Sequence, residues 1–150
     1  MKKIVFVCLG NICRSPMAEA IMKEILKEYH LDKSFQVDSK ATSFEEIGNP
    51  IYPLAQKKLK EKGIIGFSHQ AQVFRKDDYN NYDYIIGMED SNIDDLIWIV
   101  GSDKDKKIGK LIPEHNIKDP WYTRDFETAY QEIEYGCRQF LKELIKREGE

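Results

Sequence analysis

The sequence is poor in cysteine, histidine and long apolar segments, and it has no excess of positive charge. Its 150 residues include three cysteines and three histidines, and the formal net charge is −3. An odd, small number of cysteines argues against a disulfide scaffold, so we expect free thiols in a cytoplasmic protein. The charge provides no basic field for nucleic acid or an anionic membrane. No apolar stretch approaches the roughly 18 residues of a membrane span.

Two further classes of signal are missing. The apolar stretch that follows the basic residues 2–3 ends at Cys8, which is too short for the core of a secretory signal. Histidines and cysteines do not cluster with the spacing of metal ligands, so we expect no metal and no other cofactor. Repeats, low-complexity segments and linkers are absent as well. The sequence therefore predicts one domain over residues 1–150, and we expect a monomer.

The bulk composition is that of an ordinary globular domain. Hydrophobic residues make up 41% of the chain and charged residues 33%. Apolar periodicity predicts strands at residues 4–7, 35–37, 84–88 and 108–112, and helices at 16–29, 54–61, 91–99 and 126–144. Ser15 and Ser91 are candidate N-caps, with Asp94 near the third position of the second helix. The alternation predicts an α/β fold whose parallel sheet is covered by helices on both faces.

The segment that begins at Cys8 carries the clearest chemical pattern, because it follows a strand and leads into a helix. A cysteine attacks as a thiolate, which a nearby cation and a helix N-terminus stabilise; Arg14 and the following helix supply both. Gly10 and Asn11 tolerate positive φ and let backbone N–H groups turn toward an anion. The Arg14 guanidinium matches two phosphate oxygens, and the Ser15 hydroxyl is placed to donate to sulfur. The pattern predicts a site that binds an oxyanion and attacks it with Cys8.

Residues 8–16, Cys-Leu-Gly-Asn-Ile-Cys-Arg-Ser-Pro, resemble the phosphate loop of the low-molecular-weight protein tyrosine phosphatases. The resemblance covers nearly the whole chain, since further segments fall in the family's order: Asp38-Ser39, Ile47-Gly48-Asn49-Pro50, Ser68-His69, Asp83-Tyr84-Ile85, Met88, Ser91-Asn92, and residues 119–122 and 125–127. It implies a single phosphatase domain over residues 1–150, with a four-stranded parallel sheet in the order 2-1-3-4. It also implies hydrolysis of phosphotyrosine through a cysteinyl-phosphate on Cys8.

The resemblance assigns further roles along the chain. On its own, Asp119-Pro120 predicts a turn, but the family's general acid and base is the aspartate of an Asp-Pro-aromatic segment. The catalytic residues are thus expected to be Cys8, Arg14 and Asp119. Phosphate would be bound by Leu9, Gly10, Asn11, Ile12, Cys13, Arg14 and Ser15. A network of Asn11, Ser15, Ser39 and His69 would support the loop without transferring protons.

The substrate pocket is expected to be walled by Leu9, Ile12, Phe44, Glu45, Trp121 and Tyr122, with the last two flanking a phenol ring. Its rim departs from the family pattern. Phe44 stands where a small residue is usual, and Glu45 stands where an aromatic residue is usual. Either Phe44 fills the aromatic position, or the rim is more open and more acidic. After Pro50, many members of the family have an Asp-x-Arg pattern at the start of a helix, and this sequence has Tyr52-Pro53-Leu54 there.

Cys13 is a second thiol in the loop. Its size fits a small side chain that packs under the turn, whereas the resemblance implies a reversible disulfide between Cys8 and Cys13. Such a disulfide protects a nucleophile from irreversible oxidation. Cys137 lies on the apolar face of the last helix, and we expect it in the core.

Three other functions fit parts of the pattern. An arsenate reductase on this fold would resemble proteins with a relay of further cysteines, and residues 79–90 contain none. A protein-arginine phosphatase would resemble relatives with threonine at position 12, where the apolar Ile12 favours a phenol. A phosphate-binding module without activity would not require Cys8, Arg14 and Asp119 together. As partners we expect phosphotyrosine-bearing proteins or a cognate tyrosine kinase, but neither nucleic acid nor a membrane.

Overall fold

The computed structural model describes residues 1–149, and a parallel four-stranded sheet lies at its centre in the order β2-β1-β3-β4. The strands are β1 (Lys2–Cys8), β2 (Phe35–Ala41), β3 (Tyr84–Gly87) and β4 (Ile108–Lys110). β1 pairs with β2 from Lys2 opposite Phe35 to Cys8 opposite Ala41, and its other edge pairs with β3. The expected strand order is confirmed.

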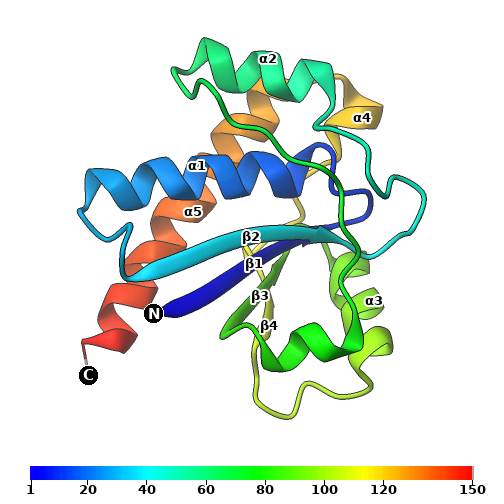
Figure 1. Ribbon diagram of the computed structural model, residues 1–150, viewed down its shortest axis with the longest axis vertical. Coiled ribbons are helices and arrows are strands. Elements are labelled where there is room, and N and C mark those ends of the chain that lie inside the picture. Colours follow the sequence, from blue (N-terminus) through cyan, green and yellow to red (C-terminus); the bar gives the residue numbers. More distant parts are fainter. Residues whose placement is uncertain (150) are drawn as a thin grey trace.

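Helices cover both faces of the sheet, as the sequence predicts. One face carries α1 (Arg14–Glu28), α2 (Pro53–Glu61) and α5 (Phe126–Glu148), and the other carries α3 (Asp90–Val100) with the 3-10 helix η1 (Lys76–Asn80) (Figure 1). A one-turn helix, α4 (Pro120–Thr123), precedes α5. The sequence did not predict η1 and α4, because elements of this length are too short to show a period.

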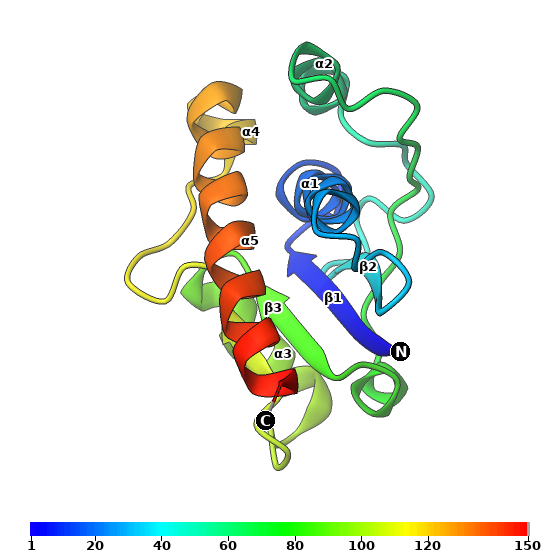
Figure 2. The same cartoon turned by 90° about the vertical axis from the view of Figure 1, so that its left-hand side faces the viewer.

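The central strand supplies both cores, since consecutive side chains of a strand point to opposite faces. Ile4 and Phe6 pack in the larger core with α1 and α5, and Val5 and Val7 pack in the smaller core on the α3 side. All four side chains are completely buried. Figure 2 shows β1 directly beneath α1, with its carboxyl end at the turn into that helix. The residues after β1 therefore follow directly from a completely buried strand.

The start of α1 differs from the prediction. The helix begins at Arg14, with Cys13 at the N-cap position, and no side chain caps it. Ser15 lies inside the first turn, and its hydroxyl oxygen is 3.0 Å from the Cys8 sulfur. The expected N-cap is thus wrong, because the hydroxyl is engaged with the cysteine and the first backbone N–H groups remain open toward the loop.

The start of α3 also needs correction. The helix begins at Asp90 rather than after Ser91, and Asn92 takes the capping role that we expected near Asp94. The Asn92 side-chain oxygen accepts hydrogen bonds from the backbone N–H groups of Met88 and Glu89, at 2.9 and 3.1 Å. With the turn between β3 and α3 held in this way, the Glu89 side chain contacts Arg14, at the start of α1.

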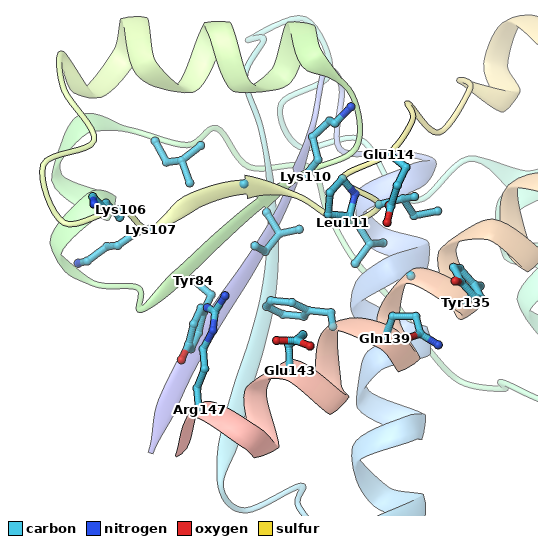
Figure 3. A pocket seen from close by; sticks show the side chains of 17 residues that line it. Tyr84, Lys106, Lys107, Lys110, Leu111, Glu114, Tyr135, Gln139, Glu143 and Arg147 are labelled. Atoms are coloured by element: carbon cyan, nitrogen blue, oxygen red, sulfur yellow. The ribbon is translucent and has the colours of Figure 1, made fainter. Parts of the chain in front are cut away.

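A hollow of about 580 Å³ lies at the edge of the sheet between β4 and α5. Figure 3 shows Lys106, Lys107 and Lys110 on the β4 side and Tyr135, Gln139 and Glu143 on α5. None of the cysteines lines this hollow. No helix within residues 1–149 has the length and apolar character needed to cross a bilayer.

Candidate active site

A cavity of about 160 Å³ opens where β1 ends, and the loop of residues 8–14 forms its floor. Ser43, Glu45 and Glu46 line one side, and Asp119, Trp121 and Tyr122 line the other. The loop takes this position because β1 and α1 are both held in the core, so that the turn between them cannot move away. The site thus lies beyond the carboxyl end of a central strand, where α/β folds bind ligands.

The Cys8 sulfur receives two hydrogen-bonding groups. The backbone N–H of Asn11 donates to it at 3.3 Å, and the Ser15 hydroxyl lies at 3.0 Å. The Asn11 side-chain amide donates to the Ser15 oxygen at 2.8 Å, which leaves the hydroxyl hydrogen free to point at sulfur. The Asn11 N–H and the Ser15 hydroxyl are therefore both positioned to donate hydrogen bonds to the sulfur.

Asn11 holds the loop in an unusual backbone shape. Its φ is +60°, in the left-handed region, where asparagine is one of the tolerated residues. The side-chain oxygen accepts the backbone N–H of Gln72 at 3.0 Å, and this donor fixes the orientation of the amide. The amide nitrogen then donates to Ser15 and also to Ser39 at 3.0 Å. Fully buried, Asn11 uses its side chain to tie the loop to β2 and to the segment after α2.

A second layer of polar groups supports Asn11. His69 Nε2 lies 2.7 Å from the Asn11 side-chain oxygen, so this nitrogen carries the hydrogen. The Ser39 hydroxyl donates to the buried Glu19 carboxylate at 2.7 Å, and Lys23 neutralises that carboxylate at 2.6 Å. Burial lowers the pKa of His69, although the nearby Glu19 charge acts in the opposite direction. The structure therefore brings Asn11, Ser15, Ser39 and His69 together, in the arrangement that the resemblance implies.

Arg14 lies at the base of the cavity, and its side chain is 3% exposed. Its guanidinium forms an ion pair with Glu89, donates to the Ile117 carbonyl at 2.9 Å and lies 3.4 Å from Asp119. Burial acts against its charge, but the facing Cys8, Asp119 and Glu89 outweigh burial and raise the pKa of Arg14. A permanent, oriented cation therefore faces the space in front of the Cys8 sulfur.

Asp119 reaches the same cavity from a point far along the chain. It stands immediately before α4, and one carboxylate oxygen accepts the Trp121 backbone N–H at 3.0 Å. The other oxygen is 3.4 Å from the Arg14 guanidinium, and the side chain is 21% exposed. The carboxylate is thus oriented by its own turn and remains accessible to a proton donor or acceptor in the cavity.

The aromatic wall is supported by one residue that does not itself line the cavity and that the sequence did not assign to the pocket. The Trp121 ring meets the Tyr52 ring edge to face at 4.8 Å between centroids. Arg124 donates to the Tyr52 hydroxyl at 2.8 Å, and the Tyr52 backbone N–H donates to the Ile12 carbonyl at 2.8 Å. Tyr52 therefore fastens the tryptophan side of the pocket to the phosphate loop. Trp121 is 43% exposed and Tyr122 is 75% exposed, so Trp121 is the firmer of the two walls.

The other side of the pocket corrects one expectation. Phe44 does not line this cavity; it is exposed and faces a neighbouring hollow, while Glu45 and Glu46 line the cavity itself. Residues of the loop alternate between its two sides, and this alternation turns Phe44 outward. Of the two alternatives left open by the sequence, the structure has the more open and more acidic rim.

Cys13 and Cys8 both line the cavity, and both are free thiols in the structure. Burial raises the pKa of the Cys13 thiol, and the neighbouring Cys8 adds to the effect. Cys13 is therefore held in its neutral form, unlike a nucleophile. Cys137 is fully buried in the larger core, as its place on the apolar face of α5 predicts.

Glu89 and Glu19 are polar residues of the site that were not predicted from the sequence. Glu89 follows β3, and the carboxyl ends of neighbouring parallel strands meet at one edge, which is the pattern that could have pointed to it. Glu19 lies on the helical face that packs inward, where a charged residue is unusual unless it is paired. Within residues 1–149, no group of three or more His, Cys, Asp or Glu side chains is arranged to hold a metal ion.

The fold thus brings a buried thiol, a fixed arginine and the Asp119 carboxylate together around a single cavity. Comparison with known proteins gives the family. The profile of the low molecular weight phosphotyrosine protein phosphatases matches residues 3–149. The chain belongs to this family, whose members are protein-tyrosine phosphatases and thus phosphoric monoester hydrolases.

Individual relatives match over nearly their whole length. The low molecular weight phosphotyrosine protein phosphatase of Homo sapiens is 41% identical over 150 residues, which cover 94% of each chain. The crystal structure of the Streptococcus pyogenes low molecular weight protein tyrosine phosphatase is 41% identical, covers 96% of this chain and 93% of its own, and superposes with a TM-score of 0.89. The crystal structure of YfkJ from Bacillus subtilis is 35% identical, covers 100% and 98%, and gives a TM-score of 0.92.

Proposed function

We propose that Cys8, Arg14 and Asp119 carry out phosphotyrosine hydrolysis in two steps. In the first, the Cys8 sulfur forms a bond to phosphorus while the bond from phosphorus to the tyrosyl oxygen breaks, and Asp119 gives that oxygen its proton. In the second, Asp119 takes a proton from water, the water oxygen bonds to phosphorus, and the sulfur leaves as thiolate. The observation that supports this proposal is the placement of thiol, guanidinium and carboxylate around one cavity.

Phosphate binding follows from the same geometry. Arg14 and the backbone N–H groups of residues 9–15 would hold the three oxygens that do not react, which is most of the catalysis in a loose phosphoryl transfer. The hydroxyl of Ser15 and the N–H of Asn11 would stabilise sulfur when it leaves. The buried network of Asn11, Ser39 and His69 keeps the loop in this shape between turnovers.

The pocket walls favour an aromatic ester over the alternatives. Ile12 and the Trp121 ring offer apolar surfaces on which a phenol ring packs, and a phosphoserine side chain is too short to bring its phosphorus to Cys8. Ile12 offers no polar group to a guanidinium, which argues against phosphoarginine. Arsenate reduction through a cysteine relay would need a further accessible thiol, and the third cysteine, Cys137, is fully buried in the core.

We infer that the rest of the chain serves this one activity, as a single domain over residues 1–150 that works as a cytoplasmic monomer on phosphotyrosine-bearing proteins or a cognate tyrosine kinase. We also infer that Cys8 and Cys13 form a reversible disulfide on oxidation. Their shared position on the cavity wall and their free thiols support this pairing. Oxidation would then store the nucleophile rather than destroy it.

Two variants test the mechanism. Cys8→Ser should abolish hydrolysis of para-nitrophenyl phosphate and phosphotyrosine peptides while inorganic phosphate still binds, because the oxygen nucleophile is weak but the loop is intact. Asp119→Asn should lower kcat on phenyl phosphate by about a hundredfold to ten-thousandfold. Its effect on para-nitrophenyl phosphate should be much smaller, since nitrophenolate leaves without a proton.

The wild-type control is a comparison of phosphotyrosine, phosphoserine and phosphoarginine peptides, together with arsenate and a thiol reductant. Phosphotyrosine should be hydrolysed fastest by a wide margin. Full activity of Cys8→Ser, or an Asp119→Asn defect that does not depend on the leaving group, would overturn the assignment of roles.

A further inference from the structure

A second hollow, of about 450 Å³, lies beside the catalytic cavity and exposes two large aromatic rings. Trp98 on α3 is 85% exposed, and Phe44 on the loop after β2 is 63% exposed. Ile99 and the buried Phe74 extend the apolar lining. Tryptophan is mostly buried in folded proteins, so an almost fully exposed Trp98 next to an exposed Phe44 is a feature that calls for a ligand.

The hollow and the catalytic cavity are the two sides of one loop. Ser43, Glu45 and Glu46 line the catalytic cavity, whereas Thr42 and Phe44 line the hollow. The loop between them is fixed to the phosphate loop by backbone hydrogen bonds, from Thr42 N–H to the Cys8 carbonyl and from Ser43 N–H to the Leu9 carbonyl, both at 3.0 Å. A ligand that extends out of the catalytic cavity over this loop therefore meets Phe44 and Trp98.

The charges of the hollow are unevenly placed. Arg75 and Lys76 lie on its rim, and neither forms an ion pair within residues 1–149. The Arg75 guanidinium lies 5.8 Å from the centre of the Phe44 ring, so the cation and the ring form one surface. Asp95 also lines the hollow, and its carboxylate accepts a hydrogen bond from the Thr42 hydroxyl at 3.4 Å. The combination of an apolar floor and two unpaired cations suits an apolar side chain with a carboxylate beside it.

We propose that this hollow is a substrate subsite that binds an apolar side chain, with a neighbouring acidic residue, of the same polypeptide whose phosphotyrosine occupies the catalytic cavity. The proposal rests on the catalytic role of the Cys8 cavity. An extended peptide advances roughly 3.3 Å per residue, so the apolar residue lies within a few positions of the phosphotyrosine. The aromatic pair then supplies apolar contact, and Arg75 with Lys76 pairs with the carboxylate.

The test uses phosphotyrosine peptides in which one position at a time, within five residues on either side, carries leucine or serine. Each kcat/KM is divided by the same enzyme's kcat/KM for para-nitrophenyl phosphate, which is too small to reach the hollow. At one position the wild-type enzyme should prefer leucine by about tenfold, which corresponds to about 1.4 kcal/mol. Trp98→Ala and Phe44→Ala should each reduce this preference to less than threefold.

Tyr135→Ala is the matched control, because Tyr135 is an exposed aromatic residue on α5 that lines the remote hollow of Figure 3. It should keep the wild-type preference. Replacing the acidic residue next to the favoured leucine by lysine should lower the normalised rate several-fold, and the Arg75→Ala/Lys76→Ala double variant should remove this difference. High salt should weaken the charge effect and leave the leucine preference.

Two results would overturn the subsite. One is the absence of any position with more than a twofold preference in an enzyme that hydrolyses para-nitrophenyl phosphate normally. The other is a leucine preference that is unchanged in Trp98→Ala. If sedimentation then shows a wild-type dimer that Trp98→Ala dissociates, the hollow is a contact between two copies of the chain and not a substrate subsite. If the wild-type protein does not hydrolyse para-nitrophenyl phosphate, the catalytic assignment itself is refuted. Failure of the proposed subsite can therefore be distinguished from failure of the proposed activity.

Discussion

Glu89 is one of three groups that hold the guanidinium of Arg14 in place. It forms an ion pair with Arg14 from the end of β3, and the Ile117 carbonyl and Asp119 complete the partners of the guanidinium. Burial acts to raise the pKa of Glu89, but the hydrogen bond from Ser91 and the charge of Arg14 outweigh it, and the pKa is lowered. Glu89 is therefore ionised wherever the enzyme is folded at neutral pH, and it acts through Arg14 as a positioning residue.

Removing this charge should disturb phosphate binding without unfolding the protein. In Glu89→Gln we expect kcat/KM for phosphotyrosine to fall by about tenfold or more, because an ion pair becomes a weaker hydrogen bond in which only Arg14 is charged. The inhibition constant of inorganic phosphate should rise in parallel, which a purely structural role would not produce. Glu45→Gln is the control, since Glu45 lines the cavity without an ion pair to Arg14. Equal phosphate inhibition in wild type and Glu89→Gln would contradict the positioning role.

At this scale, residues 8–14 could be singled out from the sequence because they are contiguous and chemically distinctive, and the structure places them around one cavity. Glu89 and Tyr52 could not be assigned to the site from the sequence, because their contacts are with residues far along the chain and a local pattern does not contain them. The sequence leaves open which side of its loop Phe44 faces for a similar reason. Outside regular structure the facing of a side chain is set by tertiary hydrogen bonds, such as those of Thr42 and Ser43, rather than by a period.

Glu127 links two helices that flank the site. It lies in the first turn of α5, where it accepts hydrogen bonds from Lys58 at 3.0 Å and Lys62 at 2.8 Å at the end of α2. Hydrogen bonds from Lys62, Lys58 and Gln131 lower the pKa of Glu127 to about 2. Because the folded-state pKa lies below the unfolded value, this interaction stabilises the fold above pH of about 4.3 and is lost as the pH falls toward 2.

Glu127→Gln should therefore lower Tm by a small amount at pH 6 and by a progressively smaller amount on acidification. The measurement is thermal unfolding followed by circular dichroism across this range, and added salt should shrink the difference because the pair is exposed. Glu61→Gln makes a useful comparison, since Glu61 pairs with Lys58 within α2 and does not join two elements. A Tm difference that grows toward low pH would refute the assignment.

The longer elements were predictable because each repeats its apolar period several times. The caps were not, since the Ser15 hydroxyl is engaged with the Cys8 sulfur and the Ser91 hydroxyl donates to the Glu89 carboxylate. Both misplaced caps lie next to functional groups, Cys8 and Glu89. Local preferences fail here because the tertiary contacts of a site compete with them.

The packing of the whole molecule depends on close approach at Gly136 in α5. A Cβ atom there would lie 2.7 Å from Leu111 Cγ and 3.1 Å from Ile112 Cγ1, in the segment that follows β4. We expect Gly136→Ala to destabilise the protein by about 1–3 kcal/mol. For a chain of this size, Tm should fall by about 2–4 °C for each kcal/mol.

Gly109→Ala in β4 is the matched control, because a Cβ there meets nothing within 4 Å. Urea and thermal unfolding of both variants provide the measurement, and kcat per folded molecule should stay at the wild-type value in each. A more stable Gly136→Ala would mean that the gain in helix propensity exceeds the cost of the contact, and that α5 can move away from the sheet.

The hydrogen-bond partners of the phosphate loop become available only late in the synthesis of the chain. The ribosome delivers Cys8 and Arg14 early, but Asn11 finds its partners only when residues 39, 69 and 72 have emerged, and Arg14 finds its own at 89, 117 and 119. During most of synthesis the reactive thiol is present without the groups that orient phosphate or supply a proton. On the mechanism proposed above, hydrolysis would be among the last properties that a nascent chain acquires, and a chain that ends before residue 119 would have the Cys8 thiol without the proposed acid.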